Sequence, residues 1–119
     1  PATKVLIIDD EPDVLYVLTH LLAPAEVSTA SSVSEARATW RTDFDLILSD
    51  VVMPNEDGVT LYEWVEEHHP EMLSRFVFMS ASPVDLDDKL DALELDHPVL
   101  WKPITRPQLF ACLEALKDM

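Results

Sequence analysis

Five short apolar runs, separated by longer stretches with helical spacing, limit the folds open to this chain more than any other feature. The runs lie at 4–9, 27–30, 45–50, 76–80 and 99–101. The first, Lys4 to Asp9, is a continuous apolar run, which is typical of a strand that is buried on both faces of a parallel sheet, whereas 27–30 is a shorter strand pattern. The sequence therefore predicts five parallel strands in an α/β fold.

The stretches between the runs carry the periodicity and the start signals of helices. Helical patterns follow Pro12, Ser32, Val59, Ser82 and Thr105, and the Ser32-x-x-Glu35 and Thr105-x-x-Gln108 spacings are typical of capping boxes. Val33, Ala36 and Trp40 are expected to form the apolar face of the second helix.

Alternating strands and helices with right-handed crossovers favour a doubly wound (βα)5 sheet. We expect the flavodoxin-like strand order 2-1-3-4-5, which places a site at the carboxyl ends of the strands.

Composition narrows the function classes. The chain has 119 residues, enough for one domain spanning 1–119. Its 23 acids against 8 Lys and Arg give a net charge of −15, which opposes direct binding to nucleic acid. No apolar run is long enough for membrane insertion, and the single Cys112 excludes an internal disulfide, so a cytoplasmic setting is expected. The start at Pro1 and the end after the last helical pattern suggest a domain of a longer protein, with a mature single-domain chain as the alternative.

Polar residues stand at the ends of four of the predicted strands. Asp9 and Asp10 end the first, Asp50 the third, Ser80 the fourth and Lys102 the fifth. Parallel strands bring these ends to one edge, where clustered carboxylates repel one another unless a cation joins them. Oxygen ligands alone select a hard ion such as Mg²⁺, whereas the histidine spacing does not suit zinc.

This residue set suits phosphoryl transfer. Asp50, at the centre of the sheet edge, is the candidate nucleophile, because a carboxylate can attack phosphorus to give an acyl phosphate. Lys102 and the Ser80 hydroxyl are suited to phosphoryl oxygens. Taken singly, each has a simpler explanation: Asp9 or Asp10 as a helix-terminal acid, Ser80 as a turn residue and Lys102 as a surface lysine. Their convergence from separate strand ends favours the shared site.

On these residues the whole chain resembles the receiver domain of two-component response regulators. The matching positions are Asp9-Asp10, Asp50, Pro54, Gly58, Ser80-Ala81 and Lys102-Pro103. The resemblance implies that Asp50 accepts a phosphoryl group from a histidine kinase or a histidine phosphotransfer domain. It also implies that Asp10, Asp50 and the Val52 backbone carbonyl ligate Mg²⁺ directly, that Asp9 acts mainly through water, and that phosphorylation repacks the face of helix 4, strand 5 and helix 5.

The sequence departs from the family pattern next to the lysine. Val99 stands where the family usually has an aromatic residue, and Trp101 is expected to face the side opposite Lys102. The segment HPVLWKP resembles receivers of hybrid histidine kinases, so an attached kinase or output domain is expected. A homodimer is left open.

Two alternatives stand beside the signalling switch. One is a Mg²⁺-dependent phosphatase working through an aspartyl phosphate, as in haloacid dehalogenases, although Glu11 occupies the position where those enzymes carry a second Asp. The other is a degenerate receiver used only for docking, which the intact set of acids, hydroxyl and lysine argues against. The resemblance to receiver domains implies that Asp50 is phosphorylated in a reaction catalysed by the domain itself and that the aspartyl phosphate is later hydrolysed, without the chain being a turnover enzyme.

Overall fold

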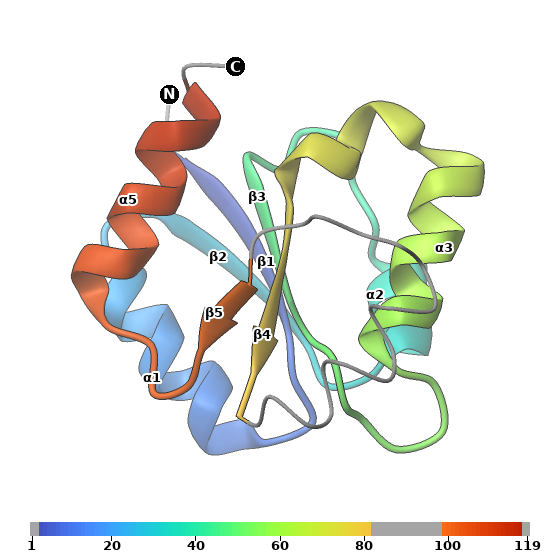
Figure 1. The fold of residues 1–119 in the computed structure, drawn as a ribbon, viewed down its shortest axis with the longest axis horizontal. Helices are drawn as coiled ribbons and strands as arrows, with labels where there is room; N and C mark the ends of the chain where they lie inside the picture. The colour runs from blue at the N-terminus through green and yellow to red at the C-terminus, as the bar shows by residue number, and fades with distance from the viewer. Residues whose placement is uncertain (1–2, 82–98, 118–119) are drawn as a thin grey trace.

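The predicted sheet and its strand order are confirmed. The computed structural model describes residues 3–81 and 99–117. The strands form a five-stranded sheet in the order β2-β1-β3-β4-β5, with every neighbouring pair parallel, and this sheet lies at the centre of the molecule (Figure 1). Its strands are β1 Lys4–Ile8, β2 Glu26–Ala30, β3 Leu46–Asp50, β4 Phe76–Ser80 and β5 Val99–Trp101. Each bound lies within one residue of its prediction.

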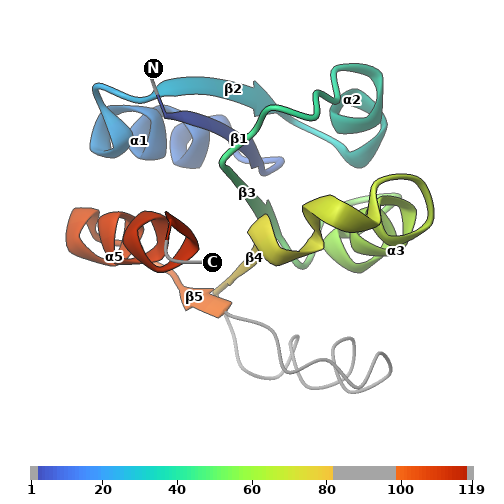
Figure 2. The same ribbon diagram turned by 90° about the horizontal axis from the view of Figure 1, so that it is seen from above.

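Helices cover both faces of this sheet. Seen from above in Figure 2, α1 and α5 lie on one face and α2 and α3 on the other. Their bounds are α1 Pro12–Leu22, α2 Val33–Ala38, α3 Gly58–His68 and α5 Arg106–Lys117. A 3-10 helix, η1 Pro70–Arg75, was not predicted, and the helix predicted after Ser82 lies outside the described residues. Among the helices that the structure describes, none combines the length and the apolar character needed to cross a bilayer.

Strand alternation divides the core into two layers. On β1, Leu6 and Ile8 pack towards α2 and α3, whereas Val5 and Ile7 pack towards α1 and α5. The same alternation runs through β3 and β4, where every residue is buried. Successive side chains of a strand point to opposite faces, so a strand covered on both faces is apolar throughout. This is the physical origin of the continuous apolar runs in the sequence.

One capping box is complete and the other is not. The Thr105 N–H donates to Gln108 Oε1 at 2.8 Å, and Thr105 Oγ1 accepts from the Gln108 N–H at 3.4 Å. Ser32 Oγ accepts from the Glu35 N–H at 3.1 Å, but the Glu35 carboxylate bonds to Ser31 instead of Ser32. The prediction of a reciprocal box at Ser32 is therefore wrong in its second half.

Trp40 corrects the prediction for the second helix. The helix ends at Ala38, so Trp40 lies beyond it and not on its apolar face. The indole packs edge-on against Phe44 and Trp64, with ring centroids 6.0 and 5.4 Å away. Trp40 therefore seals the margin of the core between α2 and α3, where edge-to-face contacts between aromatic rings are favourable.

We expect Leu48→Ala to lower the free energy of unfolding by about 2–5 kcal/mol, because Leu48 is fully buried in the central strand and its truncation leaves a cavity. Urea unfolding monitored by circular dichroism measures this change. Val17→Ala is the control, because Val17 is 51% exposed on α1 and its change should stay within about 0.5 kcal/mol. Equal losses in both variants would contradict the two-layer core.

Candidate functional site

The polar strand ends meet at one edge of the sheet. Asp9 and Asp10 directly follow β1, Asp50 closes β3, Ser80 closes β4 and Lys102 follows β5. The register aligns these ends, because Ile8 pairs with Ser49, Asp50 with Met79 and Ser80 with Trp101. All five candidate residues are thus brought to the same end of the molecule.

Three carboxylates form the acidic part of the site. Oxygen atoms of Asp9, Asp10 and Asp50 all lie within 4.8 Å of one another. Asp9 is fully buried and Asp50 is 7% exposed, whereas Asp10 faces solvent. Hard oxygen donors gathered at this spacing, one of them open to solvent, fit an ion such as Mg²⁺ that keeps several of its waters. The residues present therefore fit a magnesium site.

Lys102 neutralises the buried part of this cluster. Its Nζ lies 2.7 Å from Asp9 Oδ2 and 3.2 Å from Asp50 Oδ2. Burial lowers the pKa of Lys102, but the hydrogen bond to Asp9 and the charges of both acids outweigh burial, so its pKa is raised. Asp9 Oδ1 also accepts from the Glu11 N–H at 2.9 Å. The ammonium group therefore stays charged between two carboxylates, which is the condition for a stable buried ion pair.

Asp50 is the carboxylate most disturbed by its surroundings. Burial, followed by the nearby charge of Asp9, raises the pKa of Asp50 from its ordinary 3.8 to about 6, although Lys102 acts in the opposite direction. Burial and a neighbouring like charge both disfavour ionisation. Ionised Asp50 is thus held at a cost in free energy that a bound cation would offset.

An open pocket of about 470 Å³ gives access to this carboxylate. Ser80, which is almost fully buried, and Lys102 lie in its lining, whereas Asp9 does not. The other lining residues are Asp10, Glu11, Asp50, Val52, Met53, Pro54 and Ala81. A small anion in this pocket can reach a carboxylate, a hydroxyl and an ammonium group together.

Gly58 has a steric role that its place in a turn did not reveal. It is the only glycine of the chain and the first residue of α3, and its φ is not positive. A Cβ atom there would overlap the backbone carbonyl oxygen of Asp50. The left-handed residue of this loop is instead Asn55, with φ 67°, a conformation that asparagine tolerates. Gly58 therefore lets α3 begin directly against the backbone of Asp50.

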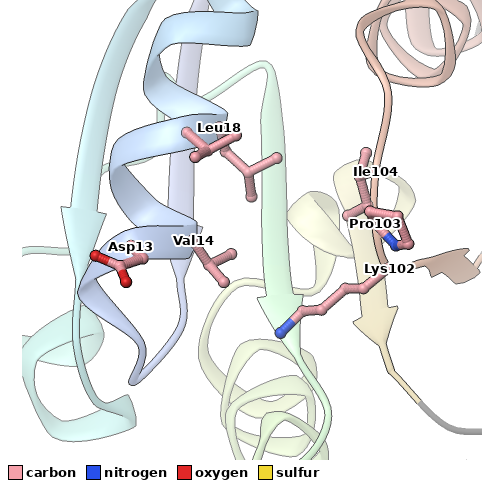
Figure 3. A pocket seen from close by; sticks show the side chains of 7 residues that line it. Asp13, Val14, Leu18, Lys102, Pro103 and Ile104 are labelled. Atoms are coloured by element: carbon pink, nitrogen blue, oxygen red, sulfur yellow. The ribbon is translucent and has the colours of Figure 1, made fainter.

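A second pocket, of about 390 Å³ and mainly apolar, adjoins the first. Figure 3 shows Val14 and Leu18 of α1 on one side of it and Lys102, Pro103 and Ile104 on the other. Lys102 lines both pockets. On β5, Val99 packs towards the α2 and α3 face, so alternation places Trp101 on that face and Lys102 towards α1. This agrees with the prediction that Trp101 and Lys102 face opposite sides.

The family model for the response regulator receiver domain matches residues 5–114. Response regulator protein PilR of Pseudomonas aeruginosa is 35% identical over 105 residues, covering 85% of this chain and 23% of that protein. Transcriptional regulatory protein GltR of the same species is 29% identical over 117 residues, covering 95% of this chain and 48% of that protein. The chain therefore spans between about a quarter and about a half of these curated relatives.

Solved structures agree with this match. A response regulator receiver domain protein from Clostridium thermocellum is 26% identical, with a TM-score of 0.82, covering 98% of this chain and 94% of that one. Chemotaxis protein CheY4 of Vibrio cholerae is 27% identical, with a TM-score of 0.78, covering 98% and 99%. Similarity of fold thus extends over nearly the whole chain.

We expect Gly58→Ala to destabilise the protein by about 1–3 kcal/mol, because the added methyl group must displace the Asp50 carbonyl. Helix propensity alone predicts the opposite sign, since alanine exceeds glycine by up to about 1 kcal/mol. Urea unfolding measures the change, with exposed Glu63→Ala on the same helix as the control. A stabilised Gly58→Ala variant would refute the close approach.

We expect Asp50→Asn to raise the stability of the metal-free protein by up to about 3 kcal/mol above pH 6. With a folded pKa of about 6 against 3.8, folded Asp50 holds more protons than the unfolded chain between these values. Wild-type stability should therefore fall as pH rises through this window, and the advantage of Asn should vanish near pH 4.

Urea titrations between pH 4 and 8, in the presence of a chelator, measure this difference. Exposed Asp13→Asn controls for the general loss of one negative charge. A difference between Asp50→Asn and wild type that stays constant across this pH range would contradict the raised pKa.

Proposed function

Because the chain belongs to the response regulator receiver domain family, we propose that it is a phosphoacceptor switch of a two-component phosphorelay. Asp50 is the phosphoacceptor, and a histidine kinase or a histidine phosphotransfer domain is the donor. The observation that carries this proposal is the placement of the Lys102 ammonium 3.2 Å from the Asp50 carboxylate, both in the lining of an open pocket. Receiver domains act in signalling and are not turnover enzymes, so family membership favours the switch over the phosphatase alternative.

The chemistry follows from what surrounds Asp50. One carboxylate oxygen of Asp50 attacks phosphorus, a P–O bond forms, the P–N bond of the donor phosphohistidine breaks, and its electron pair stays on the imidazole nitrogen. Lys102 and the Ser80 hydroxyl would bind the equatorial phosphoryl oxygens, so that the P–N bond of the donor lies in line with the attacking oxygen. Charge neutralisation and positioning account for most of the catalysis of phosphoryl transfer. Later hydrolysis of the aspartyl phosphate resets the switch.

Asp10, Asp50 and the Val52 backbone carbonyl would hold Mg²⁺ directly, with Asp9 acting through water. When bound, Mg²⁺ supplies positive charge to the carboxylates and to the phosphoryl oxygens. Asp9 also orients Lys102, because their 2.7 Å ion pair is the shorter of the two that the lysine makes. The acid cluster and the raised pKa of Asp50 support this metal site.

The donor protein is also proposed to cover the second pocket when its phosphohistidine lies at Asp50. This apolar groove between α1 and Ile104 shares Lys102 with the phosphoacceptor pocket. A protein that places its phosphohistidine at Asp50 therefore covers apolar side chains such as Val14. Burial of this surface contributes to affinity for a protein donor but not for a small phosphodonor.

Phosphorylation is proposed to repack the surface formed by the fourth helix of the family pattern, β5 and α5, and this surface transmits the signal. The position of that fourth helix falls outside the described residues. The relative named transcriptional regulatory protein GltR supports an attached output domain in a longer protein, and an attached kinase domain is the other arrangement proposed. The excess of acids argues that this domain does not bind nucleic acid itself. A cytoplasmic setting and a homodimer remain part of the proposal.

We expect incubation with Mg²⁺ and acetyl phosphate to add one phosphoryl group, detected by intact mass. Asp50→Asn should abolish the adduct, because the nucleophile is gone. Lys102→Ala should slow labelling by about tenfold or more, because it removes a charge that stabilises the transferred group. Labelling of wild type without loss in Asp50→Asn would place the phosphoacceptor elsewhere, and no adduct at all would refute the proposal.

A further inference from the structure

The loop between β3 and α3 forms one wall of the phosphoacceptor pocket. Val52, Met53 and Pro54 lie in the pocket lining. Backbone hydrogen bonds fix the two ends of the loop: the Val51 N–H donates to Met79 O at 3.0 Å, and the Gly58 N–H donates to Val51 O at 2.9 Å. The wall itself lies between these two anchors.

An ion pair between Arg37 of α2 and Glu56 links this loop to the neighbouring helix. Arg37 Nη1 and Nη2 donate to the two carboxylate oxygens of Glu56 at 2.8 and 2.7 Å. Among the side chains of residues 52–56, all of which the structure describes, only that of Glu56 makes a hydrogen bond or ion pair with another element. A paired guanidinium–carboxylate contact fixes direction as well as distance. Only Asn55, in its left-handed conformation, separates Glu56 from Pro54 of the pocket wall.

We propose that Arg37 is a positioning residue for the phosphoacceptor site, acting through Glu56 on the loop that carries the Val52 carbonyl and the Met53–Pro54 wall. This inference rests on the proposed function of Asp50. The simpler role of the pair is to stabilise the last turn of α2, where Arg37 lies. A half-exposed ion pair contributes little to global stability, so the two roles differ in what a variant changes.

Single substitutions separate positioning from long-range charge. Arg37→Gln makes the protein more negative, and Glu56→Gln makes it less negative. If the pair affects phosphorylation only through the long-range electrostatic potential of the protein, the two variants should change the rate of phosphorylation by acetyl phosphate in opposite directions. If the pair positions the loop, both should slow labelling by about threefold to tenfold. The charge-reversed double variant Arg37→Glu/Glu56→Arg should recover most of the lost rate.

The Lys4–Asp43 ion pair is a matched control. Its N–O distance is 2.7 Å, and its side chains are 31% and 43% exposed, against 29% and 39% for Arg37 and Glu56. Lys4 begins β1, at the end of the sheet opposite the site. Lys4→Gln and Asp43→Asn make the same charge changes, and Asp43→Asn also breaks the 2.7 Å ion pair with Arg41. Both control variants should leave the labelling rate within about twofold of wild type.

Amide hydrogen exchange of the metal-free protein supplies a second measurement, independent of phosphorylation. Peptides covering 52–57 should exchange faster in Arg37→Gln and Glu56→Gln and should be unchanged in the control variants. Faster exchange confined to α2 would assign the pair to helix stability alone.

The outcomes distinguish the inference from the function on which it rests. Slower labelling of both single variants, with recovery in the double variant, supports positioning. Wild-type labelling at Asp50 with unchanged rates in Arg37→Gln and Glu56→Gln, or with opposite changes, overturns the positioning role alone. Failure of the wild type to label overturns the proposed function and this inference together.

Discussion

The arrangement depends on one ammonium group held between two buried carboxylates. Lys102 Nζ contacts Asp9 at 2.7 Å and Asp50 at 3.2 Å, and these residues follow or end strands that are far apart in the sequence. Buried carboxylates without a cation would be strongly destabilising. The contact therefore requires β1, β3 and β5 to end at the same level, and the parallel register of the sheet provides this alignment.

The same site that depends on the fold also weakens it. Lys102 brings one positive charge to three clustered acids, and burial together with Asp9 raises the pKa of Asp50 to about 6. A chain selected for stability alone would place an uncharged residue at the end of β3. Functional sites commonly retain such unfavourable groups because the chemistry requires them. Here the excess negative charge is also what suits the edge of the sheet to a divalent cation.

Much of this arrangement could be predicted from the sequence because its signals are local. Apolar runs define strands buried on both faces, and a charged residue at the end of a run marks the sheet edge, as Asp50 and Lys102 show. Contacts that depend on folded geometry left no such signal. The Arg37–Glu56 pair joins residues 19 positions apart on two short segments, and η1 follows His69 without a periodic pattern. The role of Gly58 was also hidden, because turn chemistry explains a glycine equally well.

Two kinds of constraint act on the segment after Asp50. Gly58 allows α3 to begin against the Asp50 backbone, which is a steric condition, whereas Glu56 is held from α2 by charge and hydrogen bonds. On the other side of the pocket, the Lys102 N–H donates to Ser80 O at 2.8 Å, so the residues that carry the ammonium and the hydroxyl are joined through their backbones. A group that enters the pocket and forms an ion pair with Lys102 is therefore coupled, through this backbone hydrogen bond, to the end of β4 and to the segment leading into α5. The strands below are packed on both faces and resist displacement, so we expect a charge change at Asp50 to act first on the loops at this edge and, through Lys102, on the segment leading into α5.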